Sequence, residues 1–149
     1  MNADAVAITN LLYRYAECMD NGDFAGAAAL FGDARIRVAA GDEGVVDAAG
    51  ILAVWEGSVT RYADGTPRTK HVTTNAIVDI DEAGTSATAR SYYTVLQQVD
   101  DFPLQPIISG RYHDRFAKVE GTWRWVERDY TLVDLVGDLS RHLTMEIPK

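Results

Sequence analysis

The chain has 149 residues, of which 47% are hydrophobic and 24% charged, a composition typical of one globular domain. Its formal net charge of −8 argues against nucleic acid and anionic membrane surfaces as partners, because both are also negatively charged. The single cysteine, Cys18, excludes an intramolecular disulfide and fits a small buried residue better than a nucleophile. No segment resembles a signal peptide or is apolar over the length of a membrane-spanning helix, so we expect a cytoplasmic protein.

The first part of the chain has the patterns of three helices. Residues 4–19 form an amphipathic stripe, and Asn21-Gly22 is a typical helix end. A short second helix follows Asp23, a plausible N-cap, and a third is expected over residues 48–61. Between the second and third helices, residues 35–40 and 45–47 read as short strands around a glycine-rich turn.

The second part of the chain changes to the patterns of long strands. We expect strands over residues 71–80, 86–99, 107–119 and 122–132, separated by turns such as Glu82-Ala83-Gly84 and Glu120-Gly121. The tail, residues 133–149, is expected to form either a short C-terminal helix or an arm. Helices followed by an antiparallel meander predict one α+β domain over residues 1–149, with the helices packed on one face of a curved, mainly antiparallel sheet.

Asp20 and His71 are the candidate catalytic residues. Asp20 ends the first helix and His71 begins the first long strand. A carboxylate that orients an imidazole makes a general base suited to proton abstraction. The alternative is that Asp20 only terminates its helix and that His71 is a satisfied polar residue at a strand edge.

Three segments, in this order along the chain, give a resemblance to a known family. They are Leu12-Tyr13-Arg14-Tyr15-Ala16 with Met19-Asp20-Asn21-Gly22-Asp23-Phe24, His71-Val72-Thr73-Thr74-Asn75, and Gly110-Arg111-Tyr112-His113-Asp114-Arg115-Phe116 with Gly121-Thr122-Trp123-Arg124-Trp125. The chain thus resembles the SnoaL-like family of the nuclear-transport-factor-two-like superfamily, which implies a cone-shaped α+β barrel with an interior cavity. It is most similar to scytalone dehydratase and hexachlorocyclohexane dehydrochlorinase at Asp20 and His71. The resemblance implies that these two residues are in contact.

Five further residues are candidates for substrate binding. Tyr13 lies two helical turns before Asp20, Asn75 shares a strand face with His71 by simple alternation, and Arg111 would stabilise an oxyanion if it pointed inward. Trp55 and Tyr93 are expected in an apolar pocket wall. For each of them a packing or surface role is the alternative.

The other histidines limit the reaction that the resemblance implies. Sites like that of scytalone dehydratase carry a second histidine on the next strand, where this chain has none; His113 lies one strand later, and His142, in the tail, has no evident partner. The three histidines are too scattered to predict a zinc site, and we expect neither a metal nor an organic cofactor.

These observations lead to three hypotheses of function. The first is a cofactor-independent lyase or isomerase that abstracts a proton from a small apolar cyclic or polyketide-like molecule, with Asp20 and His71 as the catalytic pair. The second is a non-catalytic binding or dimerisation module of the same fold, and the third is the small subunit of a ring-hydroxylating dioxygenase. Exposed sheet surfaces tend to pair, so we expect a homodimer or homotrimer.

Overall fold

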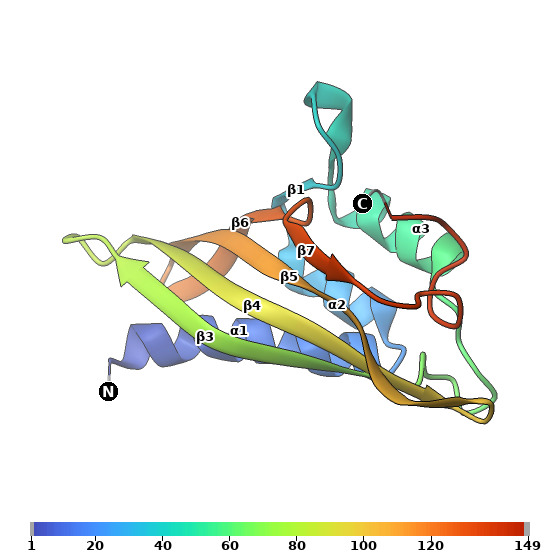
Figure 1. The fold of residues 1–149 in the computed structure, drawn as a ribbon. Helices are drawn as coiled ribbons and strands as arrows, with labels where there is room; N and C mark the ends of the chain where they lie inside the picture. Colours follow the sequence, from blue (N-terminus) through green and yellow to red (C-terminus); the bar gives the residue numbers. More distant parts are fainter. Residues whose placement is uncertain (1, 148–149) are drawn as a thin grey trace.

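Three helices precede a long twisted sheet in the computed structural model, which describes residues 2–147 (Figure 1). The helices are α1 (Ala3–Asp20), α2 (Phe24–Phe31) and α3 (Ala48–Ser58), and a short 3-10 turn covers Asp42–Gly44. The strands are β1 (Arg35–Arg37), β2 (Val45–Val46), β3 (Thr69–Ile80), β4 (Ser86–Val99), β5 (Phe102–Val119), β6 (Thr122–Asp129) and β7 (Val133–Val136). The expected α+β class, with helices on a mainly antiparallel sheet, is therefore confirmed.

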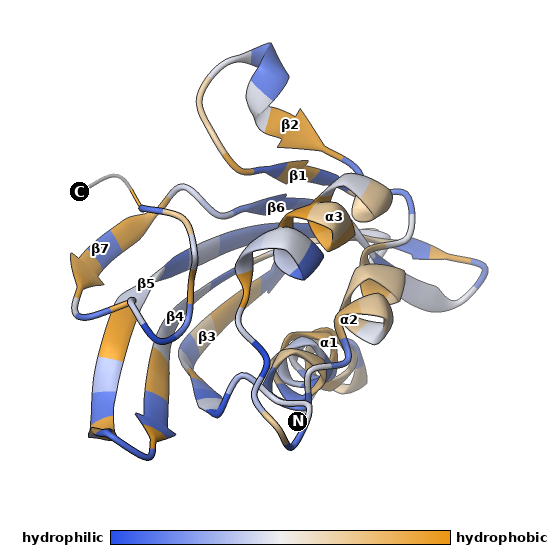
Figure 2. Cartoon of the chain, turned by 90° about the vertical axis from the view of Figure 1, so that its right-hand side faces the viewer, coloured by the Kyte–Doolittle hydropathy of each residue, from blue (hydrophilic) through white to orange (hydrophobic). Residues whose placement is uncertain are grey.

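The sheet is mixed, and its order places the long strands together. It runs β2-β1-β6-β5-β4-β3, while β7 pairs with β5. The pairing of β1 with β6 is parallel and the other pairings are antiparallel. Figure 2 shows the sheet curving around one side of the three helices. The curved sheet and the helices together enclose the core.

Capping and amphipathicity explain where α1 begins, lies and ends. The Asn2 side chain accepts hydrogen bonds from the backbone N–H groups of Asp4 and Ala5 at the start of the helix. The buried face follows helical spacing, with Ile8, Leu12, Tyr15, Ala16 and Met19. Beyond the helix, Gly22 has φ +74°, and a Cβ there would lie 2.1 Å from the Gly65 carbonyl oxygen. This glycine therefore lets the loop before β3 approach the end of α1 closely.

Several element boundaries differ from the sequence-based expectation; β5, for example, begins at Phe102 rather than at residue 107, and β6 ends at Asp129 rather than at residue 132. The third helix ends at Ser58 rather than Arg61, because Val59 becomes extended and bridges Leu143 of the C-terminal segment. The tail is an arm that begins as a strand: Val133–Val136 pairs with β5, and the following segment returns towards α3 (Figure 1). No helix within residues 2–147 is long and apolar enough to cross a membrane.

Candidate active site

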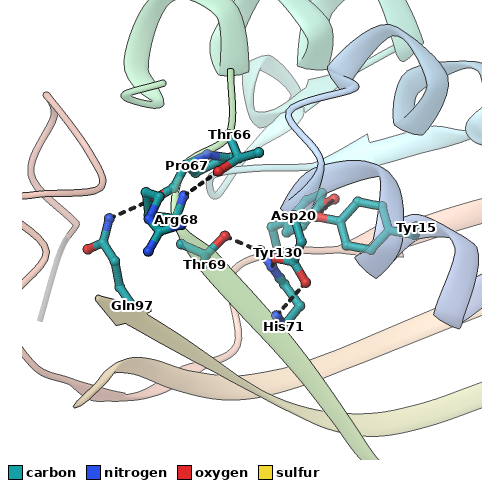
Figure 3. A network of polar contacts seen from close by, with 9 residues as sticks. All are labelled: Tyr15, Asp20, Thr66, Pro67, Arg68, Thr69, His71, Gln97 and Tyr130. Atoms are coloured by element: carbon teal, nitrogen blue, oxygen red, sulfur yellow. Dashed lines mark hydrogen bonds and ion pairs between the residues drawn. The ribbon is translucent and has the colours of Figure 1, made fainter. Parts of the chain in front are cut away.

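Asp20 and His71 form a direct, nearly buried hydrogen-bonded pair. The Asp20 Oδ1 and His71 Nδ1 atoms are 2.6 Å apart, and the two side chains are 9% and 8% exposed. Asp20 also accepts hydrogen bonds from the His71 backbone N–H at 2.8 Å and from the Thr69 hydroxyl at 2.9 Å (Figure 3). The end of α1 and the start of β3 are thus joined through one carboxylate with a fixed orientation.

This contact determines which nitrogen of His71 can act as a base. Because the Asp20 carboxylate only accepts hydrogen bonds, His71 Nδ1 carries the proton and Nε2 keeps its lone pair in the neutral ring. If Nε2 gains a proton, the carboxylate stabilises the resulting imidazolium. The pair therefore has the geometry of a general base with its orienting carboxylate.

His71 lies in the wall of a partly open cavity of about 190 Å³. Apolar side chains from α1, α3, the sheet and the C-terminal arm form most of the wall, among them Met19, Ile51, Trp55, Val95 and Leu143. Such a space accepts a compact molecule of one or two rings, and its apolar wall strengthens any polar interaction made inside it.

Four tyrosines are among the residues that line the cavity: Tyr15, Tyr93, Tyr112 and Tyr130. The Tyr130 hydroxyl donates to the Tyr15 hydroxyl at 2.8 Å, and the Tyr93 and Tyr112 rings stack with their centroids 4.4 Å apart. Burial raises the pKa of Tyr93 to about 12 and raises the pKa of the other three as well. At neutral pH these residues are therefore O–H donors, suited to stabilising negative charge on a bound oxygen.

A buried ion pair lies behind the tyrosines. Arg128 on β6 donates to both carboxylate oxygens of Asp114 on β5, at 2.7 and 3.0 Å, and neither side chain is exposed. The Arg128 guanidinium also lies 3.7 Å from the centre of the Tyr112 ring and 4.6 Å from that of Tyr15. The ion pair fixes the Arg128 guanidinium, and its cation–π contacts help to hold the Tyr15 and Tyr112 rings in place.

The structure places the proposed binding residues in two groups. Trp55 and Tyr93 lie in the cavity wall, as expected, and are 6% and 7% exposed. Tyr13, by contrast, is 46% exposed and lies outside this cavity, in a separate pocket of about 290 Å³ that Asp20 and His71 also line. A helix turns by about 100° per residue, so the position after the buried Leu12 faces away from the core.

Asn75 and Arg111 also fail to reach the cavity. A β-bulge between Thr74 and Ile77 interrupts the alternation of β3, and Asn75, with φ +40°, is exposed. Its amide oxygen accepts a hydrogen bond from the Thr74 hydroxyl instead. Arg111 lies on the outer face of β5 and makes two bonds to Asp134, at 3.0 and 3.1 Å. The expectation that either side chain points inward was wrong.

Several cavity residues were not singled out from the sequence as site residues. Tyr15, Tyr112, Tyr130 and His142 line the cavity, and Asp114 and Arg128 support it. Asp114 carried a usable signal, since it alternates with Tyr112 and Phe116 on a strand face that should otherwise be apolar. Among residues 2–147 no cluster of three or more His, Cys, Asp or Glu side chains is arranged to hold a metal ion.

Solved structures with the same fold are similar to this chain at low sequence identity. A protein of unknown function with a cystatin-like fold from Nostoc punctiforme is 24% identical, with a TM-score of 0.69, covering 93% of this chain and 98% of that one. A protein provisionally assigned as a scytalone dehydratase from Novosphingobium aromaticivorans is 23% identical, with a TM-score of 0.64, covering 85% and 81%. The beta subunit of a provisionally assigned aromatic-ring-hydroxylating dioxygenase from the same organism is 22% identical, with a TM-score of 0.67, covering 88% and 89%. These likenesses show the fold alone.

No match is found among curated proteins. At the level of the family, residues 2–129 match the SnoaL-like domain, which covers all three helices and the strands β1 to β6. The chain therefore belongs to the SnoaL-like domain family.

Proposed function

We propose that the protein is a cofactor-independent lyase or isomerase in which His71 removes a proton from a carbon atom of a small cyclic substrate. The observation that carries the proposal is the 2.6 Å contact between Asp20 and His71, because it leaves Nε2 as the basic nitrogen of a residue in the wall of an apolar cavity. Membership of the SnoaL-like family and the fold shared with a provisionally assigned scytalone dehydratase are consistent with it.

The proposed reaction begins at a carbon next to a carbonyl group. Nε2 of His71 takes the proton, and the C–H electron pair forms a carbon–carbon double bond while negative charge develops on the carbonyl oxygen. Asp20 stabilises the imidazolium, and tyrosine hydroxyls such as that of Tyr15 stabilise the oxyanion. The imidazolium then returns the proton to another carbon, which completes an isomerisation, or to a departing hydroxyl group, which completes a dehydration.

The cavity limits the substrate class. Its volume of about 190 Å³ fits one or two rings, its wall is mainly apolar, and its donors are neutral hydroxyl groups. A compact cyclic ketone or hydroxyketone matches these features better than a charged metabolite, whose desolvation would need an opposite charge in the cavity.

The proposal is tested with a panel of small cyclic hydroxyketones. Water loss or a double-bond shift is followed by absorbance and mass spectrometry for the wild-type protein, His71→Ala and Asp20→Asn. Both variants should lose turnover by at least ~100-fold while keeping their circular dichroism spectra. Arg111→Ala, which changes only a surface ion pair, is the matched control and should retain wild-type rates. Full activity in either site variant would exclude the mechanism.

The same protein samples distinguish the alternative functions. A non-catalytic binding module would bind members of the panel without converting any of them. The small subunit of a dioxygenase would need a large partner, so a stable homo-oligomer of this chain alone argues against that alternative.

We also propose a homo-oligomer formed through the outer face of the sheet. Val72 and Ile77 on β3 and Tyr92 on β4 are 40%, 44% and 54% exposed on neighbouring strands of this face. Burying them against a second copy would remove apolar surface from water. Analytical ultracentrifugation of the wild-type protein and Tyr92→Glu should show association only in the former.

A further inference from the structure

The C-terminal arm brings a second histidine to the cavity. His142 lies in the same cavity wall as His71, although it is 13 residues beyond the end of the family match at residue 129. The backbone N–H of His142 donates to the Leu139 carbonyl at 3.0 Å, and its backbone carbonyl accepts from the Thr60 N–H at 2.9 Å. The neighbouring Arg141 carbonyl accepts from the Gln97 amide at 3.0 Å and from the Tyr62 hydroxyl. Backbone contacts on both sides thus fix the backbone position of His142.

The ring itself lacks a hydrogen-bond partner. His142 is only 7% exposed, and its buried Nδ1 atom makes no hydrogen bond to any described residue. Buried polar side chains nearly always have partners, because leaving one unpaired destabilises the folded state. His142 therefore brings to the cavity wall, which His71 also lines, a polar ring whose Nδ1 has no partner among the described residues.

The ionisation state of His142 indicates what it can bind. Burial is the main cause that lowers its pKa to about 4, with a further contribution from the charge of His71, while Asp20 acts in the opposite direction. The tyrosines that share the cavity with it are neutral O–H groups at the same pH. At neutral pH the ring is therefore an uncharged imidazole with one N–H donor and one acceptor nitrogen.

We propose that His142 is a second substrate-binding residue, whose neutral imidazole hydrogen-bonds an oxygen atom of the cyclic substrate next to the carbon that His71 deprotonates. The inference rests on the proposed function and narrows its substrate to ring compounds that carry a carbonyl or hydroxyl group within reach of the arm. A neutral imidazole polarises a carbonyl group without transferring its proton, so the electrons from the broken C–H bond are stabilised on the substrate oxygen. No oxidant or other co-reactant is needed, because the proton taken by His71 leaves with the product or returns to it.

The test compares two ligands that differ in one oxygen atom. The ketone 2-tetralone and its parent hydrocarbon tetralin have the same ring system, and their dissociation constants are measured for the wild-type protein, His142→Phe and His142→Gln. Wild type should prefer 2-tetralone, and His142→Phe should weaken 2-tetralone binding about tenfold, one lost hydrogen bond, without changing tetralin binding. His142→Gln keeps a hydrogen-bonding group and should restore part of the preference.

Two further results keep the test independent of variant folding and of turnover. In ¹⁵N NMR spectra of the wild-type protein, the ring nitrogens of His142 should shift on addition of 2-tetralone and not of tetralin. If His71→Ala loses turnover but the preference for 2-tetralone does not depend on His142, only this inference fails. If the preference depends on His142 but no substrate is converted, the proposed reaction fails instead. Equal weakening of both ligands by His142→Phe, or no ketone preference in the wild-type protein, overturns the role of His142.

Discussion

The buried ion pair between Asp114 and Arg128 should be a large contributor to stability once one partner is removed. The two residues face each other across β5 and β6, with N–O distances of 2.7 and 3.0 Å and no exposed surface on either side chain. Asp114→Asn keeps the size of the side chain but leaves the Arg128 charge buried without a counter-charge. Breaking a buried pair in this way typically destabilises a protein by about 3–5 kcal/mol.

The next rung of the same strand pair supplies a matched control. Arg115 and Glu127 are paired at 3.5 Å, but their side chains are 62% and 45% exposed. Solvent screens this pair, so Glu127→Gln should change the free energy of unfolding by at most ~1 kcal/mol. Urea unfolding, followed by tryptophan fluorescence, gives the free energy of unfolding of both variants. The slope of this free energy against urea concentration should be the same as in the wild-type protein.

The double variant Asp114→Asn/Arg128→Met separates the unpaired charge from the loss of packing. Removing the buried cation should recover part of the stability that Asp114→Asn loses. If Asp114→Asn unfolds within ~1 kcal/mol of Glu127→Gln, the pair is not isolated from water and the reasoning is refuted.

Three further predictions concern the cavity and its surroundings. The pKa of His142 is lowered from 6.5 to about 4, so the unfolded chain takes up the proton first as the pH drops. Between pH 7.5 and pH 5 this should lower the free energy of unfolding by about 2 kcal/mol. In urea titrations at the two pH values, His142→Gln should lack this part of the loss. Gly110→Ala should destabilise the protein by about 1–3 kcal/mol, because its Cβ would lie 2.6 Å from the Leu132 carbonyl oxygen and 2.8 Å from the Tyr93 hydroxyl; an unchanged melting temperature would contradict this packing. Arg111→Ala should alter stability by less than ~1 kcal/mol and leave 2-tetralone binding unchanged in calorimetry, and a loss of affinity would return Arg111 to the site.

Local sequence patterns account for most of the fold. The helices begin at residues whose side chains cap them, such as Asn2, Asp23 and Asp47, and the long strands follow alternating burial. An arm was one of the two forms expected for the tail, but its strand β7 escaped prediction because β7 is mostly exposed and is held by pairing with β5 rather than by a pattern of its own. Asn75 escaped it because a bulge with positive φ reverses the alternation on which the expectation depended.

The site was harder to predict from the sequence than the fold, because its residues come from distant segments. Asp20 and His71 are 51 residues apart, and only the family resemblance gave a reason to expect their contact. His142 carries no local signal at all: its burial depends on backbone hydrogen bonds to Thr60 and Leu139 and on those made by the neighbouring Arg141. Asp114 and Arg128 were better marked, since charged residues on the inward face of a strand are rare unless they are paired.

The most direct test of the proposed role of His71 is proton exchange at a carbon atom. In D₂O the wild-type protein should accelerate deuterium incorporation next to the carbonyl group of small cyclic ketones such as 2-tetralone, followed by ¹H NMR against buffer alone. His71→Ala and Asp20→Asn should reduce the exchange to the buffer rate, whereas Arg111→Ala should match the wild type. Exchange that persists in His71→Ala, or that the wild-type protein does not accelerate for any ketone tried, would contradict the proposed proton abstraction.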